Sequence, residues 1–353
     1  MDLIPSKLPL ESSVTPLLNH RVLWLDKDST VYARQLDTPG QLDKSVDWGE
    51  TWTPVYTFGS TAIERFQRLD DDSILVHTRN GRFSRSTDDG VTFSETFISG
   101  NGYTGSWGGL DAYANFVVFA PYAYADYDKV YLSNDYGKEG SWKEILHVKK
   151  GVSHPHDVRF DPYENIIWTV WGDHRPSDTI LFSDNLGGTW QQSSKEQYYR
   201  CTNIMPFPEN VWFGTDEFFV TGAYRHVRPK KWTSQTKVKP ELYWAAKKNN
   251  EDGAPNHWAT RPAMVYGNKP MAYWGYKQPT SNPSMPATIF STDGETVFPV
   301  WMQSHLPETE SSILAVFGPD NTGNIIADLR SSYTVGEETT DFAMVRVNLG
   351  VQN

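Results

Sequence analysis

The chain has 353 residues, a formal net charge of −11 and one cysteine, Cys201; apolar residues make up 38% of it and aromatic residues 14%. The acidic balance argues against DNA or RNA as the main partner, because binding a phosphate backbone needs a basic face. One cysteine excludes an intrachain disulfide and a CxxC motif, and the lack of any apolar run of about 20 residues predicts no membrane span.

Short strand-like runs separated by turns follow one another along the chain. Residues 1–20 read as an extended segment, and strands are then predicted at 63–69, 73–77, 82–86 and 92–97. The runs HDVRFDP, IIWTVWGD, TILFSDN and TWQQ repeat this order after residue 156. Helical periodicity is nearly absent, so the pattern predicts an all-β protein.

One turn recurs along the chain. It reads SVDWGETW from Ser45, STDDGVTF from Ser86, SNDYGKEGSW from Ser133, SDNLGGTW from Ser183 and STDGETVF from Ser291. The starts are therefore 41, 47, 50 and 108 residues apart, and the last interval is close to two repeats. A strand-built repeat of about 40 to 50 residues is typical of a β-propeller. The turn falls between the third and fourth strands of each four-stranded antiparallel blade.

The number of blades follows from the turns and from two further segments. The five turns give five blades, residues 202–245 give a sixth without the turn, and the tail after residue 310 gives a seventh. We predict seven blades, with six as the alternative, in one domain over residues 1–353. The segment 1–20 is expected to close the ring by covering a sheet edge, and the segment 230–262 is expected to be a long inserted loop.

The repeated turn has a structural role in this interpretation. Asp47 can accept hydrogen bonds from its own loop, Gly49 permits a positive φ, and Trp52 is expected to pack between sheets. The pattern S-x-D-x-G-x-T-W resembles the Asp-box, or BNR repeat, of sialidase-like propellers, with an insertion after Ser133 and Asn185 in place of aspartate. The resemblance implies turns on the outer rim, far from the functional site.

A second resemblance covers His154 to Asp216. The pattern H-x-H, then G-D, Q-x-x-R and G-T-D is similar to a bacterial and phage subgroup of Asp-box proteins. Some seven-bladed polysaccharide lyases bind a divalent ion through a His-x-His pair and a Gln, which by analogy makes His154, His156 and Gln197 a candidate metal site. Two histidines spaced i, i+2 on a strand point the same way, although they can also bind substrate without metal. No sialidase-type R-I-P stretch precedes Ser45.

Other candidate residues lie where first strands begin and second strands end, at one expected axial face. Asp173 and Asp216 can act as general acid and base on a sugar, with His174 beside them. Arg200 can bind the carboxylate of an acidic sugar. Each of these can instead stabilise a turn or a wall. The candidate substrate-binding residues, which can also be packing residues, are Trp107, Tyr122, Tyr124, Trp258, Tyr276 and Arg261.

These residues lead to three hypotheses of function. The first is a carbohydrate-active hydrolase or lyase, assisted by a single divalent cation such as Mn, Zn or Ca and using no organic cofactor. The second is a non-catalytic glycan-binding propeller, such as a phage tail component with other virion proteins as partners. The third is a protein-interaction scaffold. The first residues lack the pattern of a signal peptide, so we expect the cytoplasm or a virion as the location.

Overall fold

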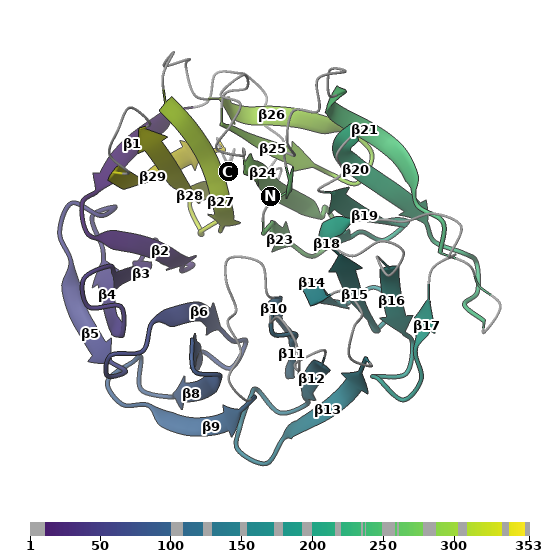
Figure 1. Cartoon of the computed structure of the whole chain (residues 1–353), viewed down its shortest axis with the longest axis horizontal. Helices are drawn as coiled ribbons and strands as arrows, with labels where there is room; N and C mark the ends of the chain where they lie inside the picture. Colours follow the sequence, from purple (N-terminus) through teal and green to yellow (C-terminus); the bar gives the residue numbers. More distant parts are fainter. Residues whose placement is uncertain are drawn as a thin grey trace. The chain divides into compact units, whose positions relative to one another are not determined.

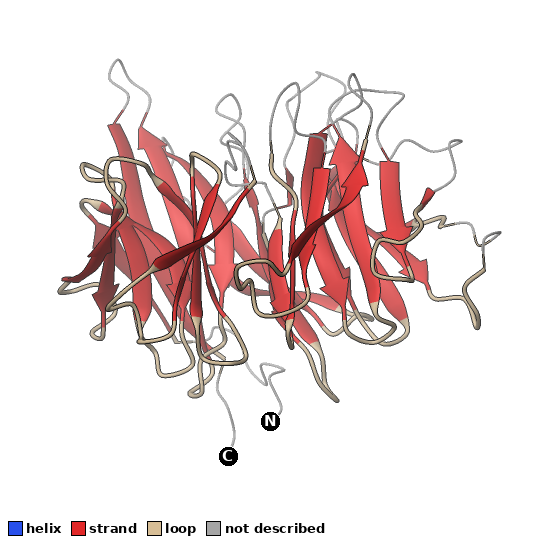
Figure 2. Ribbon diagram, turned by 90° about the horizontal axis from the view of Figure 1, so that it is seen from below, coloured by secondary structure: helices blue, strands red, loops and turns tan. Residues whose placement is uncertain are grey.

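The structure is a computed structural model. It describes residues 11–99, 109–122, 129–148, 154–172, 179–192, 200–215, 220–233, 236, 238–248, 258–259, 261–277, 287–302, 309–333 and 339–349. Strands and turns make up these ranges, with no helix among them (Figure 2). By its internal contacts the chain divides into two compact units. The first is Met1–Pro54, Asp216–Gly222 and Trp244–Asn353, and the second is Val55–Thr215 and Ala223–Tyr243.

Three sheets belong wholly or mainly to the first unit (Figure 1). One contains β2 (His20–Leu25), β3 (Val31–Gln35), β4 (Gln41–Ser45) and β5 (Thr53–Thr57). Another contains β22 (Trp258–Ala259), β24 (Met271–Lys277), β25 (Thr288–Thr292) and β26 (Val297–Met302), with β23 (Ala263–Val265) paired to β24. The third has the order β1 (Ser12–Leu17), β29 (Thr339–Asn348), β28 (Asn324–Tyr333) and β27 (Thr309–Phe317).

Four sheets belong wholly or mainly to the second unit. The first two contain β6 (Ile63–Arg68), β7 (Ile74–Thr78), β8 (Arg82–Ser86) and β9 (Ser94–Ile98), then β10 (Leu110–Tyr113), β11 (Phe116–Phe119), β12 (Lys129–Ser133) and β13 (Trp142–His147). The last two contain β14 (His154–Asp161), β15 (Ile166–Gly172), β16 (Thr179–Ser183) and β17 (Gln191–Gln192), then β18 (Cys201–Pro206), β19 (Asn210–Thr215), β20 (Val220–Val227) and β21 (Glu241–Lys248).

These seven antiparallel sheets are the blades of a seven-bladed β-propeller. The predicted fold class is confirmed, and the number of blades is seven rather than six. The repeated turns join third to fourth strands, as at β4–β5 and β8–β9. Among the described residues, no helix is long and apolar enough to cross a membrane.

The sheet formed by the last three strands takes its fourth strand from the start of the chain. Strand β1 pairs antiparallel with β29, with Ser12 opposite Val347 and Leu17 opposite Phe342. Without β1 the backbone groups along that side of β29 would form an open sheet edge. Residues 12–17 therefore complete the last blade.

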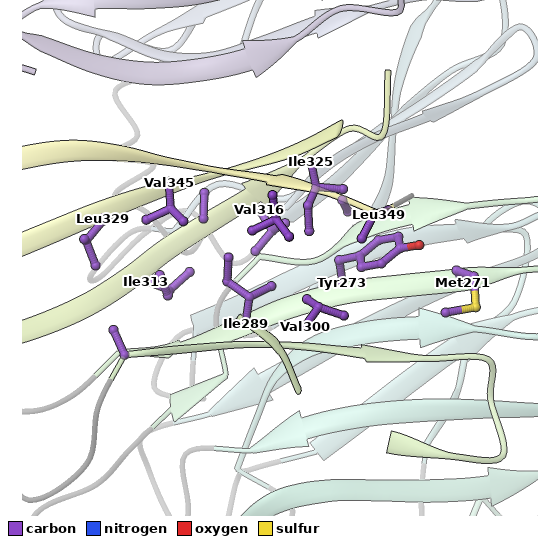
Figure 3. Packing of buried hydrophobic residues seen from close by; sticks show 14 residues of the cluster. Met271, Tyr273, Ile289, Val300, Ile313, Val316, Ile325, Leu329, Val345 and Leu349 are labelled. Atoms are coloured by element: carbon purple, nitrogen blue, oxygen red, sulfur yellow. The ribbon is translucent and has the colours of Figure 1, made fainter. Parts of the chain in front are cut away.

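Neighbouring sheets are held together by interlocking apolar side chains. Figure 3 shows this packing in the first unit, where Tyr273, Ile289 and Val300 from β24–β26 meet Ile313 and Val345 from β27 and β29. Each of these five side chains is at most 2% exposed. Strands of this blade pair therefore carry β-branched and aromatic residues on the buried face, as sheet packing favours.

The segment 230–262, expected as a long loop, is partly built into a blade. Residues 241–248 form strand β21. Ahead of it, Val238 is fully buried and Trp232 packs on the same apolar cluster as Trp168 and Phe182. The apolar residues at 232 and 238 anchor this connection, which the loop prediction did not anticipate.

The first two turns share one hydrogen-bond pattern. In the second, the Ser86 hydroxyl donates to Asp88 Oδ1 at 2.8 Å and accepts from Gly90 N at 2.9 Å. Thr92 then donates its backbone N–H to Asp88 Oδ1 and its hydroxyl to Asp88 Oδ2, at 2.9 and 2.6 Å. Gly90 has φ +89° and lies against Val55 of the preceding blade, so a Cβ there would be strained and would clash. Hydrogen bonds within residues 86–92 therefore stabilise this turn.

The later turns vary this pattern in ways their sequences explain. At Asn185 the amide oxygen accepts from Thr189 N at 2.8 Å, so the amide replaces the carboxylate as acceptor. The insertion after Ser133 brings the Ser141 hydroxyl to 2.6 Å from the Ser133 hydroxyl. In the shortened fifth turn, the hydroxyl of Thr292, rather than that of Ser291, accepts a hydrogen bond from the backbone N–H of Gly294.

The aromatic residue that ends each turn packs as predicted in several copies. Trp142 stacks on Phe97 of the preceding blade with ring centroids 4.8 Å apart. Trp190 donates its indole N–H to the carbonyl of Ile145, also in the preceding blade, at 2.8 Å. The turns therefore join neighbouring blades of the second unit, which is a structural role.

We predict that Asp88→Asn reduces the acid sensitivity of folding. Hydrogen bonds from the Thr92 side chain and backbone, and then from Ser86, lower the pKa of Asp88 to about 2. A carboxylate with a lowered folded-state pKa stabilises the fold above its unfolded value near 4, and this stability is lost as pH falls toward 2. The amide keeps the acceptor, as Asn185 shows, but does not titrate.

Urea unfolding at pH 6, 4 and 2.5 measures this effect. The stability of Asp88→Asn should fall less steeply below pH 4 than that of the wild type, whereas Asp184→Asn, at an exposed position of the Ser183 turn, should keep the wild-type slope. If the stability of Asp88→Asn falls with pH as steeply as that of the wild type, the Asp88 carboxylate does not contribute to the acid sensitivity of folding.

Candidate functional site

Two buried histidines lie where strand β14 begins, in the second unit. His154 and His156 are each 3% exposed. The β14–β15 pairing shifts register between Pro155 and Asp157, which makes His156 the extra residue of a β-bulge. Bulges re-aim side chains and are common beside functional sites. The bulge interrupts the regular alternation of the strand at His156. The two imidazole rings nevertheless lie close together, with their Nε2 atoms 3.2 Å apart.

Hydrogen bonds fix the orientation of the His156 ring. Its Nδ1 lies 2.8 Å from the carbonyl oxygen of Cys201 in β18, an acceptor that requires a proton on Nδ1. In the neutral ring the lone pair is then on Nε2, which lies 3.2 Å from Nε2 of His154. Cys201 itself is fully buried in the apolar core. A neighbouring backbone carbonyl that fixes the histidine tautomer is the arrangement found behind metal-binding histidines.

Small and aromatic neighbours shape the space around the pair. Tyr122, just after β11, packs on His154 at 4.1 Å between ring centroids in an edge-on arrangement, and lies 6.0 Å from His156. Gly172 ends β15, and a Cβ there would lie 2.3 Å from Cε1 of His156. Only glycine leaves room for the imidazole at this point.

A chain of buried charges joins three blades beneath the histidines. Arg159 of β14 lies 3.1 Å from Asp157 of its own strand and 3.1 Å from Asp111 of β10. Asp157 also accepts from the backbone N–H of Ile204 in β18 at 3.1 Å, and Asp111 accepts from Phe160 N at 3.0 Å. The three charged side chains are between 3% and 6% exposed. This network holds the start of β14 in place relative to both neighbouring blades.

A second buried ion pair lies at the other end of β14. Burial raises the pKa of Asp161, and the guanidinium of Arg228, 2.7 Å away, acts in the opposite direction. The Trp168 indole also donates to Asp161 at 3.1 Å. Arg228 belongs to the basic cluster at residues 225–231, so at least this arginine is structural.

Four further candidate residues lie within the described ranges, besides the histidines and Tyr122. Arg200 lies immediately before β18 in the second unit and is half-buried. Arg261, in the first unit, forms an isolated bridge with Ala315. Trp258 and Tyr276 lie in the paired strands β22 and β24, where the structure describes their backbone only. The candidates Asp173, His174, Gln197, Asp216, Trp107 and Tyr124 lie outside the described residues and stay predictions.

Sequence reasoning missed two features of the second unit. The first is that the Asp111 carboxylate lies in the buried ion network with Arg159. The signal was present, because three charged residues alternate with apolar ones in HDVRFD of β14. It also missed that inner strands β6, β14 and β18 carry a bulge near their starts, at Glu64, His156 and Thr202.

The described residues hold no group of three His, Cys, Asp or Glu side chains that could bind a metal ion. A metal at this site would therefore take the two histidines and at least one further ligand. Gln197 is the predicted one.

No family model and no curated protein matches the chain. Solved structures similar to it include YCF48 from Cyanidioschyzon merolae, with 13% identity, 96% of this chain and 98% of that chain covered, and a TM-score of 0.58. Virginiamycin B lyase from Staphylococcus aureus also has 13% identity and a TM-score of 0.58, with 96% and 100% covered.

A GH74 enzyme from Niastella koreensis is similar over a part of its length. It has 15% identity and a TM-score of 0.51, and the match covers 96% of this chain but 44% of that enzyme. Likenesses at such low identity show the β-propeller fold alone, which these proteins share with this chain.

We predict that Arg159→Met strongly destabilises the protein. Removing the guanidinium leaves two buried carboxylates without their cation, and breaking a buried pair in this way costs about 3–5 kcal/mol. The control is Lys129→Met, which breaks the more exposed pair of Lys129 with Glu144 and should cost less than about 1 kcal/mol.

Urea unfolding of both variants measures the difference. The triple variant Arg159→Met, Asp111→Asn, Asp157→Asn should recover part of the loss, because it removes the unpaired charges. If Arg159→Met and Lys129→Met lower the free energy of unfolding equally, the buried ion network does not make the large contribution to stability that we predict.

Proposed function

We propose that this chain is a carbohydrate-active β-propeller whose site is centred on His154 and His156. The observation that carries the proposal is the pair of buried imidazoles with Nε2 atoms 3.2 Å apart. If the start of β14 only filled the core of the blade, apolar residues would be expected there. Buried imidazole rings lose their hydration and need hydrogen bonds to offset that loss. Here a bulge, a backbone carbonyl and a glycine without Cβ all serve to hold one ring in place.

We further propose that the pair holds one divalent cation. With metal–nitrogen distances of about 2.1 Å and a tetrahedral angle of about 109°, two imidazole ligands have nitrogens about 3.4 Å apart. The Nε2–Nε2 distance of 3.2 Å is close to this value. The Nδ1 contact of His156 with Cys201 leaves Nε2 as the donor to a metal. A bound cation would supply Lewis-acid stabilisation of negative charge on a substrate oxygen.

The acid and base of a hydrolase or lyase would come from residues that follow the second strands. Asp111 and Asp157 are held by Arg159 and are therefore unsuited to proton transfer. Asp173 and His174 follow β15 in the sequence, and Asp216 follows β19. These three residues are our candidates for proton transfer, with Arg200 before β18 as a substrate-binding group.

The resemblance of the repeated turn to the Asp-box supports a carbohydrate ligand. The turns at Ser45 and Ser86 share the serine–aspartate–threonine hydrogen bonds, and the turn at Ser183 keeps them with asparagine. A GH74 enzyme is among the proteins with a similar fold. The fold alone leaves the activity open, so the proposal depends on the histidine pair.

The second candidate is a binding propeller without catalysis, such as a phage tail component that recognises a glycan. The observation in its favour is that Asp111 and Asp157 both form ion pairs with Arg159. These two carboxylates are therefore not available as a general acid or base. YCF48, one of the proteins of similar fold, has been solved with a bound D1 peptide. In this candidate, Tyr122, the two histidines and Arg200 would bind the glycan. No residue would need to donate a proton.

Elemental analysis of the purified chain tests the metal. We expect about one divalent ion per chain in the wild type and in His147→Ala, a variant of a more exposed histidine in the same unit. The double variant His154→Ala, His156→Ala should lose the ion while circular dichroism shows an unchanged fold. No ion in the wild type after dialysis against Zn, Mn or Ca salts would overturn the metal proposal.

A polysaccharide panel tests the activity. We expect new reducing ends from hydrolysis, or ultraviolet absorbance of an unsaturated product from elimination, with the wild type and His147→Ala but not with the double variant. Binding on a glycan array without product would favour the non-catalytic candidate. Neither binding nor product would contradict a carbohydrate function and favour a protein-interaction scaffold.

A further inference from the structure

The bulge that positions His156 has a counterpart two blades earlier in the same unit. The β6–β7 pairing shifts register between Ile63 and Arg65, so Glu64 is the extra residue near the start of inner strand β6. Glu64 is 4% exposed, close to the 3% of His156. A carboxylate buried at the corresponding position of a sheet needs a specific partner, because an unpaired buried charge is strongly unfavourable.

One partner of Glu64 is Arg79, the residue that follows β7. Its Nε lies 2.7 Å from Glu64 Oε1, and its backbone N–H donates to the carbonyl of Ala62 at 2.8 Å. The two side chains differ in exposure, with 48% for Arg79 and 2% for Glu64. The buried carboxylate therefore fixes one edge of a guanidinium that is half open to solvent.

A second arginine, Arg65, lies beside this ion pair. Arg65 is 7% exposed and donates from Nη1 to the backbone carbonyl of Glu64 at 2.8 Å. Burial, and then the nearby Arg65 charge, lower the pKa of His77 to about 3, so this histidine is neutral at pH 7. Arg65 and Arg79 thus place two guanidinium groups beside the Glu64 carboxylate, in a chain whose net charge is −11.

The cluster and the histidine pair lie at the same end of their blades. Each blade of the second unit is a meander of four antiparallel strands, so inner strands begin, and second strands end, at the same end of these blades. Glu64 and His154 are near the starts of inner strands, while Arg79 and Tyr122 follow second strands. The blade of β10 contacts both β6 and β14 (Figure 1), so one blade separates Arg79 from the histidines.

We propose that Arg79, oriented by Glu64, is a subsite for the anionic group of an acidic saccharide. The group is a uronate carboxylate or a sulfate ester, since both present oxygens in the geometry that a guanidinium matches. This inference rests on the proposed carbohydrate function and adds the charge of the ligand to it. A ligand that bridges from Arg79 toward the histidines would span one blade and hence more than one sugar unit.

Nuclear magnetic resonance of the ¹⁵N-labelled chain tests the subsite directly. The Arg79 Nε–H signal is assigned from its absence in Arg79→Gln, and glucuronate, glucose 6-sulfate and glucose are titrated as probes. We expect a saturable shift with one or both charged sugars and none with glucose. Response to glucuronate alone identifies a carboxylate ligand, and response to the sulfate alone identifies a sulfated one.

The matched control is Arg82→Gln. Arg82 is 49% exposed and also pairs with a glutamate, Glu95, but it lies at the start of β8 in the same blade. Binding of the charged probe, followed through backbone signals, should be weakened about tenfold or more in Arg79→Gln, as loss of a charge-assisted hydrogen bond implies. It should be unchanged in Arg82→Gln.

Two results would overturn the subsite: no saturable shift of Arg79 Nε–H with either charged sugar, or equal binding by Arg79→Gln and Arg82→Gln. Failure of the proposed function looks different. If charged sugars bind at Arg79 but the chain neither binds nor changes any polysaccharide, the subsite stands and the carbohydrate-active proposal fails.

Discussion

The guanidinium of Arg159 is the interaction on which the candidate site depends. It neutralises Asp111 and Asp157, and these carboxylates in turn accept backbone N–H groups from β14 and β18. One side chain thereby links three inner strands, β10, β14 and β18, in the second unit. Because the histidines lie at the start of β14, their separation is determined by this charge network as much as by their own contacts. The buried ion network and the candidate site thus lie on neighbouring residues of one strand.

Much of the fold can be predicted from the sequence because the repeated turn is local. Ser86, Asp88, Gly90 and Thr92 interact within seven residues, so their chemistry is visible in the sequence and marks the third and fourth strands of a blade. The spacing of such turns gives the blade size. The blade of β18–β21 lacks the turn, and the blade of β27–β29 takes β1 from the other end of the chain. Both were therefore predicted from strand patterns alone.

The site was less predictable because its determinants act across blades. Spacing brought His154 and His156 together, and the structure places their Nε2 atoms in contact. A bulge has no fixed sequence signature, so neither the bulged position of His156 nor that of Glu64 could be derived from alternation. Asp111 and Arg159 are 48 residues apart, and only the packing of β10 on β14 makes them partners. The charged residues of HDVRFD are visible in the sequence, but the partner of Arg159 in β10 is not.

The pairing of β1 with β29 has a consequence for how the chain is made. A ribosome releases the strands in order, so residues 12–17 emerge first and must remain without their partner until residues 339–348 have been synthesised. Until then β1 is an unpaired strand, and contacts between such distant residues form slowly. The last blade can be assembled only after translation has passed all the others. A nascent chain halted before β29 would therefore expose a β-strand that can pair with another chain.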